Sequence, residues 1–253
     1  MNIVDAFELS LDGPELICLV GGGGKTTTMF ALAQALKFLG KRVLVTTTTN
    51  IIRPGREECD RVIVDNLSEK NFFGDIPSGT ITVLGATAVK VGNETKLTGV
   101  DKSFLAQLSQ EGLFDCLLVE ADGSKRKPIK APAHYEPIVP DNATRVIGVV
   151  GLDALGNPIT EEHVHRVELF CQVVKRLPGE LLDAEAVVEL IVSPQGLFKG
   201  VPEGCKRYVL LNKAEDARRR AYGEDILSRL RQRKNVPVSR CVIAAMAQGR
   251  IYP

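Results

Sequence analysis

The sequence contains no tryptophan, and phenylalanine and tyrosine supply its whole 5% aromatic content. Modules that bind nucleic acid by stacking bases on aromatic rings need more such side chains, so the composition argues against that class. Net charge is also nearly absent, because 32 Lys and Arg face 31 Asp and Glu, for a formal net charge of +1. That balance provides no general attraction to nucleic acid or to an anionic membrane.

Long apolar segments are absent as well. The longest apolar runs, such as Leu16–Val20 and Val146–Val150, fall far below the ~18 residues that cross a bilayer. The first ten residues, MNIVDAFELS, contain neither a basic residue nor an apolar core, unlike a secretory signal. We therefore expect a cytoplasmic protein with no membrane partner.

Metal-binding and disulfide patterns are also missing. The six cysteines are scattered without a CxxC pair, and histidine occurs three times. Neither a structural zinc site nor a disulfide framework is expected from this pattern. His163 and His165 lie two residues apart in a predicted helix, so they do not share a face and do not form a chelating pair.

What the sequence does contain is an alternation of short apolar, β-rich runs with helical patterns. The expected strands are 15–20, 42–47, 62–64, 80–84, 116–121, 146–150, 208–211 and 240–244, and the expected helices are 26–39, 160–177, 183–191 and 216–233. This alternation predicts an α/β fold with a mostly parallel sheet covered on both faces. No low-complexity linker divides the chain, so residues 1–253 are expected to form one domain. Residues 50–111 are its least regular part and are compatible with an insertion.

The strongest motif is LICLVGGGGKTTT, in which an apolar strand leads to Gly21–Gly24 and a helix opens with Lys25 and Thr26. Glycine amides can surround phosphate oxygens because no Cβ obstructs them, and the helix start adds positive partial charge. Lys25 is expected to reach the β- and γ-phosphates and Thr26 to bind Mg²⁺, with Thr27 beside them in the nucleotide site. In the usual phosphate-loop pattern, G-x-x-x-x-G-K-[ST], the first glycine would stand at position 19. Leu19 occupies that position, so the sequence departs from the usual pattern there. The alternative is that these glycines form only a flexible hinge. A hinge would require neither the strand before the glycines nor the Lys-Thr pair after them, so this alternative explains less of the motif.

Two acidic residues end the predicted strand 116–121. Side chains alternate across a strand, so Glu120 and Asp122 point the same way at the edge where open α/β sheets bind ligands. One carboxylate can hold Mg²⁺ and the other can orient an attacking water, which makes Lys25, Glu120 and Asp122 the catalytic candidates. At the same edge, Thr48 and Asn50 can contact Mg²⁺ or phosphate, although threonine is also an ordinary strand residue.

The segment LLNKAED resembles the NKxD guanine motif of GTPases. Asn212 is expected to brace the loop and Lys213 to cover the base. The acid at the expected place is Glu215, with Asp216 one residue later, and this shift weakens guanine selectivity because bidentate pairing depends on distance. GTP is favoured over ATP, and both stay open. Asp216 is also a good helix N-cap, and the two roles are compatible.

A basic, proline-rich loop follows the acidic strand. Its cations are Lys125, Arg126, Lys127 and Lys130, and His134 lies in the same segment. They can bind a second anion, act as a transition-state cation, or form a solvated face. A second basic stretch, 206–234, holds ten Lys and Arg against four Asp and Glu. No base-reading motif accompanies it, so a solvated helix face is favoured over a nucleic-acid footprint.

Several stretches together resemble the YqeC family, namely GGGGKTT, VEADGSKRKPIKAPAHYEPIVP, VHRVE, GLFKG and LNKAED. The first also resembles the GGxGKTT loop of nickel-insertion GTPases and of MinD-type ATPases, whose signature lysine is replaced here by Val20. The family resemblance implies a P-loop NTPase-like three-layer sandwich. It also implies an accessory role in maturation or selenium-cofactor assembly of selenium-dependent molybdenum hydroxylases. Residue by residue, it points to Gly21–Thr27, Glu120, Asp122, Lys125–Lys130, His134, His165 and Arg166.

Three functions follow as hypotheses. The first is a Mg²⁺-dependent nucleoside triphosphatase, using GTP or ATP, whose hydrolysis resets a loop that grips a molybdenum hydroxylase or a cofactor-assembly protein. The second is a kinase-like or nucleotidyl-transfer enzyme that holds a small anionic substrate on Lys125–Lys130. The third is a nucleotide-gated binding module without turnover. A homodimer is compatible with all three.

Overall fold

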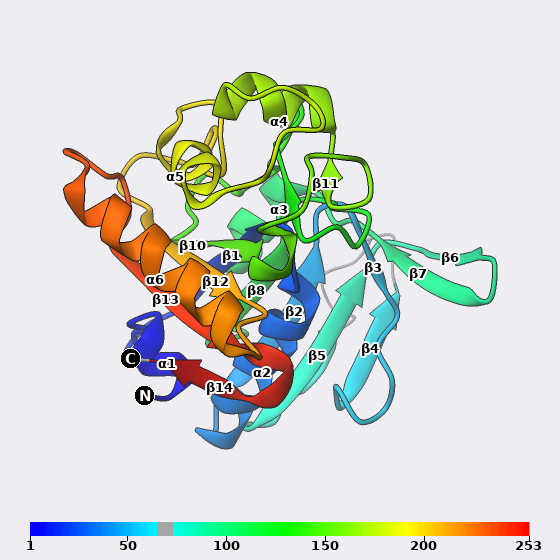
Figure 1. Cartoon of the computed structure of the whole chain (residues 1–253). Coiled ribbons are helices and arrows are strands. Elements are labelled where there is room, and N and C mark those ends of the chain that lie inside the picture. Colours follow the sequence, from blue (N-terminus) through cyan, green and yellow to red (C-terminus); the bar gives the residue numbers. More distant parts are fainter. Residues whose placement is uncertain (65–72, 253) are drawn as a thin grey trace.

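A large, mostly parallel β-sheet forms the centre of the molecule (Figure 1). The computed structural model describes residues 1–64 and 73–252, so residues 65–72 of the irregular region fall outside it. Within the described residues the sheet has nine strands in the order β14-β13-β12-β10-β1-β8-β2-β5-β4. All neighbouring pairs are parallel except β13 and β14. The strands are β1 Glu15–Gly21, β2 Arg42–Thr47, β4 Arg61–Val64, β5 Thr80–Gly85, β8 Cys116–Glu120, β10 Arg145–Gly151, β12 Lys206–Asn212, β13 Arg240–Ala245 and β14 Arg250–Tyr252.

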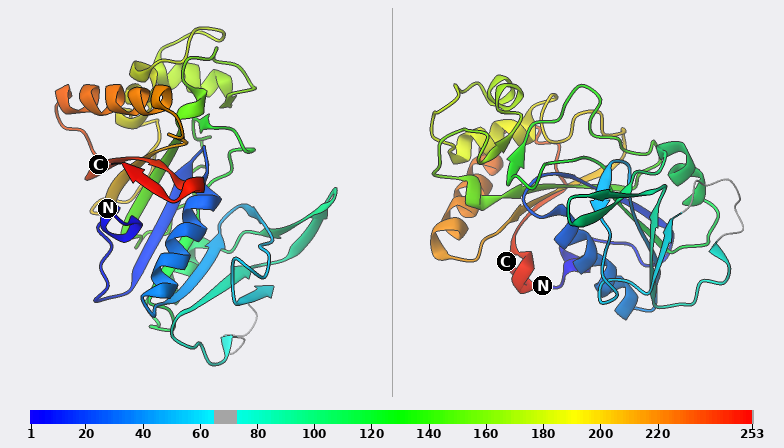
Figure 2. Two further views of the ribbon diagram at one scale, coloured as in Figure 1. Left: turned by 60° about the horizontal axis from the view of Figure 1, so that its bottom comes forward. Right: turned by 90° about the vertical axis from the view of Figure 1, so that its right-hand side faces the viewer.

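Helices cover both faces of this sheet, as Figures 1 and 2 show. The helices are α1 Ile3–Ala6, α2 Lys25–Phe38, α3 Lys102–Leu108, α4 Val167–Val174, α5 Ala184–Val192 and α6 Ala217–Gln232, with 3-10 turns η2 Leu152–Ala154 and η3 Met246–Gln248. The buried side chains form two clusters, one shared with α1 and α2 and the other with α3 to α6. The predicted three-layer α/β sandwich, the architecture of P-loop NTPases, is confirmed.

Strand β1 illustrates why the sheet forms. All seven of its residues are buried, and successive side chains go to opposite clusters. Leu16, Cys18 and Val20 lie in the cluster under α3 to α6, whereas Ile17 and Leu19 lie in the cluster under α2. A strand buried on both faces has a continuous apolar sequence, which is the signal that predicted these strands. Each expected strand agrees with the structure within two residues.

The predicted helix 160–177 is wrong in its first half. Residues Val164–His165 form the short strand β11, which pairs in parallel with β9, Ile129–Lys130, and α4 begins only at Val167. Arg166 has a φ of 66°, outside the right-handed helical region, so a helix cannot continue through it. The β9–β11 pair anchors the basic loop to the body of the protein.

The irregular region 50–111 contributes to two different sheets. Its strands β4 and β5 extend the central sheet. Three other strands, β3 Asn50–Ile52, β6 Ala88–Val91 and β7 Glu94–Thr98, form a separate antiparallel sheet in the order β3-β7-β6, which we call the arm. Figure 2 shows the β6–β7 hairpin of the arm projecting from the body.

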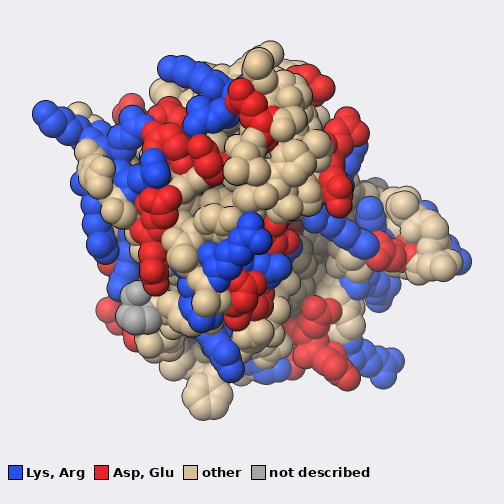
Figure 3. All heavy atoms as spheres, in the orientation of Figure 1, with Lys and Arg blue, Asp and Glu red and all other residues tan. Residues whose placement is uncertain are grey.

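The surface carries charges of both signs in close mixture. Figure 3 shows Lys and Arg along the left edge, over α6, with acidic side chains beside them. There Arg229 pairs with Asp225 and Glu185, and Arg233 pairs with Glu185 and Glu189. The excess of basic residues in this stretch is thus partly neutralised by acids from α5. Among the described helices, none combines the length and the apolar character that spanning a membrane requires.

Candidate functional site

Gly21–Gly24, here called the glycine loop, leaves the end of β1 in the middle of the sheet, between β8 and β10. Gly23 has a φ of 78°, and a Cβ on it would lie 2.3 Å from the Gly151 amide nitrogen. Gly24 has a φ of 112°, and its Cβ would lie 2.6 Å from the Asn212 side-chain nitrogen. Glycine is therefore required here both by backbone conformation and by close packing against β10 and β12.

The backbone amides from Gly21 to Thr27, in the glycine loop and at the start of α2, divide into two groups. Those of Gly21, Gly22 and Gly23 donate to the Asp122 carboxylate, the Val149 carbonyl and the Lys127 carbonyl, at 2.9–3.1 Å. The next four amides, Gly24 to Thr27, have no acceptor among the residues that the structure describes. We expected the glycine amides to surround a ligand. The structure instead ties three of them to protein and leaves the open donors at the start of α2.

Lys25, the first residue of α2, is buried, with its side chain 3% exposed. Its ammonium donates to the Gly21 carbonyl at 2.7 Å and lies 3.1 Å from Asp122 Oδ1 and 3.7 Å from Glu120 Oε1. Burial alone lowers the pKa of Lys25, but the two carboxylates outweigh it and raise the pKa above its ordinary value. Lys25 therefore stays protonated and holds β8 against the glycine loop.

The two predicted acids both reach Lys25 but otherwise have different surroundings. Glu120 accepts a hydrogen bond from the Thr26 hydroxyl at 2.7 Å, and burial raises its pKa more than Lys25 and Thr26 lower it. Asp122 is 2% exposed, accepts hydrogen bonds from the Gly21 amide and forms ion pairs with two lysines, Lys25 and Lys130. Asp122 therefore stabilises the glycine loop from the side that does not face the pocket.

A row of alternating charges continues behind Asp122. The Lys130 ammonium lies 3.0 Å from Asp122 Oδ2 and 2.6 Å from Glu136 Oε2, and Arg166 pairs with the same Glu136 oxygen. Burial alone raises the pKa of Glu136, but hydrogen bonds from Arg166 and Lys130 bring the pKa down to about 2. Burial, followed by the charges of Arg166 and Lys130, lowers the pKa of His165 to about 4. Asp122, Lys130 and Arg166, which the family resemblance singled out, form a structural ion cluster with Glu136, which it did not single out. His165, also singled out, lies beside this cluster.

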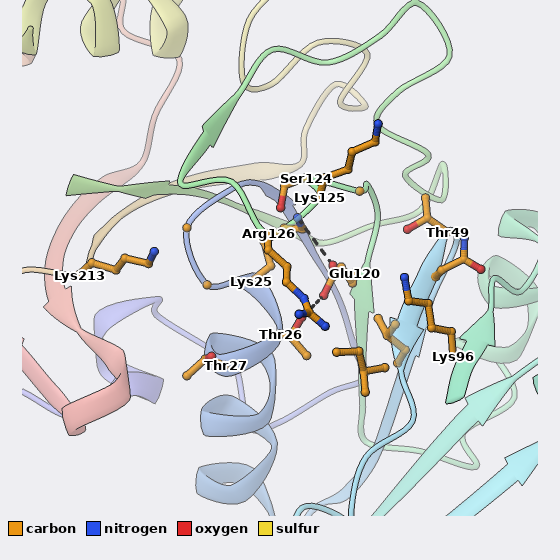
Figure 4. A pocket seen from close by; sticks show the side chains of 16 residues that line it. Lys25, Thr26, Thr27, Thr49, Lys96, Glu120, Ser124, Lys125, Arg126 and Lys213 are labelled. Atoms are coloured by element: carbon orange, nitrogen blue, oxygen red, sulfur yellow. Dashed lines mark hydrogen bonds and ion pairs between the residues drawn. The ribbon is translucent and has the colours of Figure 1, made fainter. Parts of the chain in front are cut away.

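A pocket of about 450 Å³ opens in front of the glycine loop (Figure 4). One side, the glycine-loop wall, is made by Gly23–Thr27 and Glu120. The opposite side, the arm wall, is made by Thr49, the strand β3 and Lys96 of β7. The remaining lining residues are Gly123, Ser124, Lys125, Arg126 and Lys213. Figure 4 shows Lys213 and Lys96 on opposite sides of Thr26 and Glu120.

The pocket gathers ten of the predicted site residues, which are Gly23, Gly24, Lys25, Thr26, Thr27, Asn50, Glu120, Lys125, Arg126 and Lys213. The others do not line it: Gly21, Gly22, Asp122, Thr48, Lys127, Lys130, His134, His165, Arg166, Asn212 and Asp216. Thr48 donates to the Ile138 carbonyl at 3.1 Å and Lys127 to the Glu162 carbonyl at 3.2 Å, while His134 is exposed beside Tyr135. The sequence missed Lys96, because a single lysine in a polar strand carries no local signal.

The end of β12 supports the glycine loop from the other side. Asn212 donates to the Gly23 carbonyl at 2.8 Å and accepts from the Met246 amide at 3.0 Å. Lys213 lines the pocket and its ammonium lies 2.7 Å from Asp153 Oδ2. Asp216 caps α6, accepting from the Arg219 amide at 2.9 Å. Glu215 pairs with the Arg219 guanidinium at 2.8 Å. Both acids of the guanine-like motif therefore interact with Arg219.

None of the six thiols is activated. Cys18, Cys59, Cys116 and Cys171 are buried, and Cys205 and Cys241 are partly buried. Burial raises the pKa of all six, to about 11 for Cys205 and about 12 for Cys241. Reactive cysteines need a lowered pKa, so the structure supplies no thiolate for nucleophilic or carrier chemistry.

Comparison with known proteins places these residues in a family. The protein family described as YqeC protein matches residues 17–168, a range that includes the glycine loop, both acids and the basic loop. The chain is also similar to the uncharacterized protein YqeC of Escherichia coli strain K12. The two are 32% identical over 238 residues, which cover 91% of this chain and 90% of the relative. On both findings, the chain belongs to the YqeC family.

Proposed function

We propose that this protein binds a Mg²⁺–nucleoside triphosphate in the pocket and hydrolyses it. The observation that carries the proposal is the set of donors on the glycine-loop wall. The four consecutive amides of Gly24 to Thr27 have no acceptor among the described residues, and all four residues, Lys25 among them, line the pocket. A helix start that presents free amides and a cation is suited to the oxyanions of a phosphate group.

The residues also fit a magnesium ion. Of the described residues that line the pocket, Glu120 alone carries a carboxylate, and it lies 2.7 Å from the Thr26 hydroxyl. A hydroxyl and a carboxylate at the edge of a phosphate site, completed by water and phosphate oxygens, are ligands that Mg²⁺ accepts. The ion would neutralise the charge that develops on the phosphates during transfer. Because Glu120 is the carboxylate facing the pocket, holding the ion and orienting the attacking water both fall to it.

Nucleotide binding requires Lys25 to move. Its ammonium exchanges the Gly21 carbonyl and Asp122 for phosphate oxygens, which leaves Asp122 without one of its two lysines. A buried carboxylate that loses its only cation costs several kcal/mol. Lys130, 3.0 Å from Asp122, stays in place and keeps that carboxylate paired. The ion cluster thus permits Lys25 to leave while the glycine loop keeps its shape.

Base selectivity is expected to be weak. Lys213 lies on the side of the pocket opposite Lys96 (Figure 4), and we propose that the base lies on this side. Pairing with guanine needs a free carboxylate at that place. Glu215 and Asp216 are both engaged by Arg219, so we expect ATP and GTP to bind with similar affinity.

The biological role rests on family resemblance. The resemblance to the YqeC family implies an accessory role for selenium-dependent molybdenum hydroxylases, and we propose that nucleotide turnover here serves maturation of such an enzyme or assembly of its selenium cofactor. The partner is then the hydroxylase or a cofactor-assembly protein. Hydroxylase activity in cells that carry this chain with Lys25→Ala is expected to equal that of cells without the chain.

Calorimetric titration with ATP and GTP, with and without Mg²⁺, tests the proposal directly. Lys25→Ala is expected to weaken nucleotide binding at least about a hundredfold, because it removes a charge-assisted contact in a buried site. Lys37→Ala is the matched control, since Lys37 lies at the exposed end of the same helix and pairs with Asp60. Undiminished binding by the Lys25 variant contradicts the proposal, and binding without phosphate release favours the non-hydrolysing module.

A further inference from the structure

The arm wall faces the glycine-loop wall but has no role in the proposed nucleotide site. It consists of Thr49, β3 and Lys96, which lie across the pocket from Thr26 and Glu120 (Figure 4). In the nucleotide complex proposed above, a triphosphate at the start of α2 extends toward Lys213, which lies on the side of the pocket away from Lys96 (Figure 4). The half of the pocket between Glu120 and the arm therefore stays open beside the phosphate end of the nucleotide.

Lys96 gives this half of the pocket a positive charge that no acid of the described residues pairs with. It is partly buried on β7, opposite Ile52 and Val89 on the neighbouring strands. Within the described chain, no acid lies within 4.0 Å of its ammonium. The acid on the same strand, Glu94, pairs instead with Arg126. A partly buried cation without an acid is stabilised when an anion binds beside it.

Further donors surround the same space. Arg126 and Lys125 both line the pocket from the loop after β8, with φ values of 62° and 48°. Lys125, like Lys96, has no acid partner among the described residues. Lys96, Lys125 and Arg126 face two acids here, Glu94, which pairs with Arg126, and Glu120, which lies 3.7 Å from Lys25. Lys96 and Lys125 therefore add positive charge that neither of these acids pairs with. The exposed Asn50 side chain adds an amide donor on the arm side, and no described group accepts from it.

We propose that Lys96, Asn50 and Arg126 form a subsite for a second ligand, a small oxyanion of the carboxylate or phosphate type. An ammonium and an amide donor from the arm, together with a guanidinium donor from the basic loop, are suited to a group with several acceptor oxygens. Ile52, which is 42% exposed at the rim, can contact an organic part of such a ligand. The inference rests on the proposed function, because the nucleotide defines which half of the pocket is left free.

The test is titration of inorganic phosphate, and separately of malonate, into protein saturated with Mg²⁺ and a non-hydrolysable ATP analogue. Saturation fills the glycine-loop wall, so that the probe reports on the arm wall alone. Lys96→Ala is expected to weaken probe binding about fivefold to tenfold, the effect of one partly screened charge-assisted contact. Asn50→Ala is expected to weaken it about twofold to threefold.

Lys90→Ala is the control, since Lys90 lies on β6 of the same hairpin, is exposed and does not line the pocket. Equal weakening by the Lys90 and Lys96 variants, or no saturable probe binding in the wild type, would overturn the subsite. The analogue's own affinity is measured first. If the analogue binds and the probe does not, the subsite fails while the proposed function stands. If the analogue does not bind, the proposed function fails.

Discussion

The two walls of the pocket differ in whether their charged side chains are paired within the protein. The glycine-loop wall is backed by buried charges that neutralise one another, from Lys25 through Asp122, Lys130 and Glu136 to Arg166. The arm wall stands on a small sheet outside the core and carries Lys96 without an acid partner in the described chain. Folding pairs the charges behind the first wall, whereas Lys96 of the second wall has no acid partner within the described chain and is paired only in the anion complex proposed above. Substitutions behind the first wall should therefore change stability, and those on the second should change binding.

The largest effect is expected at Lys130. Lys130→Met removes the cation between Asp122 and Glu136, and both carboxylates then lose a partner 2.6–3.0 Å away in a buried site. Removing one partner of a buried ion pair costs about 3–5 kcal/mol, so the free energy of unfolding in urea should fall by that amount. The control is Lys102→Met, which breaks an exposed pair with Asp141 and should cost less than about 1 kcal/mol. Equal losses in the two variants would mean that the cluster is not the anchor of this wall.

Acidification is expected to weaken the same cluster in two steps. His165 has its pKa lowered from 6.5 to about 4, so the unfolded chain takes up its proton first and stability falls between pH 6.5 and 4. Glu136 has its pKa lowered from 4.5 to about 2, so its contribution is present above pH 4.5 and is lost toward pH 2. At 1.36 kcal/mol per pKa unit the lowering from 4.5 to about 2 limits the Glu136 contribution to at most about 3.4 kcal/mol.

Unfolding free energies measured in urea between pH 7 and 3 check this prediction. His165→Gln should flatten the upper step, because the titrating group is gone, and Glu136→Gln should flatten the lower one. Glu94→Gln on the arm serves as the comparison and should leave the profile unchanged, since its pair with the exposed Arg126 is screened by solvent. A profile that does not respond to either cluster variant would show that these pKa values do not govern acid stability.

The smallest effect is expected for Arg126. Its guanidinium is 71% exposed and pairs with Glu94 across the gap between the basic loop and the arm. Arg126→Ala should change the free energy of unfolding by less than about 0.5 kcal/mol, because exposed ion pairs contribute little. The measurement is a double-mutant cycle with Glu94→Ala. A coupling above about 1.5 kcal/mol would mean that this pair holds the arm in place, and the contrast between the walls would be lost.

The elements that the sequence predicted well are those buried on both faces. Strands β1, β8 and β10 each contain a continuous apolar run, with charged residues only at their ends, and this pattern can be recognised without knowing the neighbouring elements. The arm was not predicted, because all four residues of β6 are exposed and therefore show no apolar face. Helix α4 was predicted too early for a different reason. The turn at Arg166 depends on the pairing of β9 with β11, which is not a local property.

The site residues likewise divide into those that a local motif predicts and those whose place depends on distant parts of the chain. Lys25, Thr26 and Glu120 lie in motifs whose spacing fixes their positions, and the structure brings them together. The different surroundings of Glu120 and Asp122 could not be predicted, because they depend on Lys130, eight residues further along the chain from Asp122. Lys96 could not be predicted at all, because its place in the pocket depends on how the arm folds over the sheet edge.

Asn212 has a consequence for how the protein is made. Its side-chain amide joins the carbonyl of Gly23 to the amide of Met246, two residues more than 200 positions apart. Domains generally fold as units while the ribosome adds roughly 5–20 residues each second. The Gly23 turn therefore acquires this support only after residue 246 has emerged. A nascent chain that stalls before that point should carry an incompletely supported turn, even though the turn's own residues were translated first.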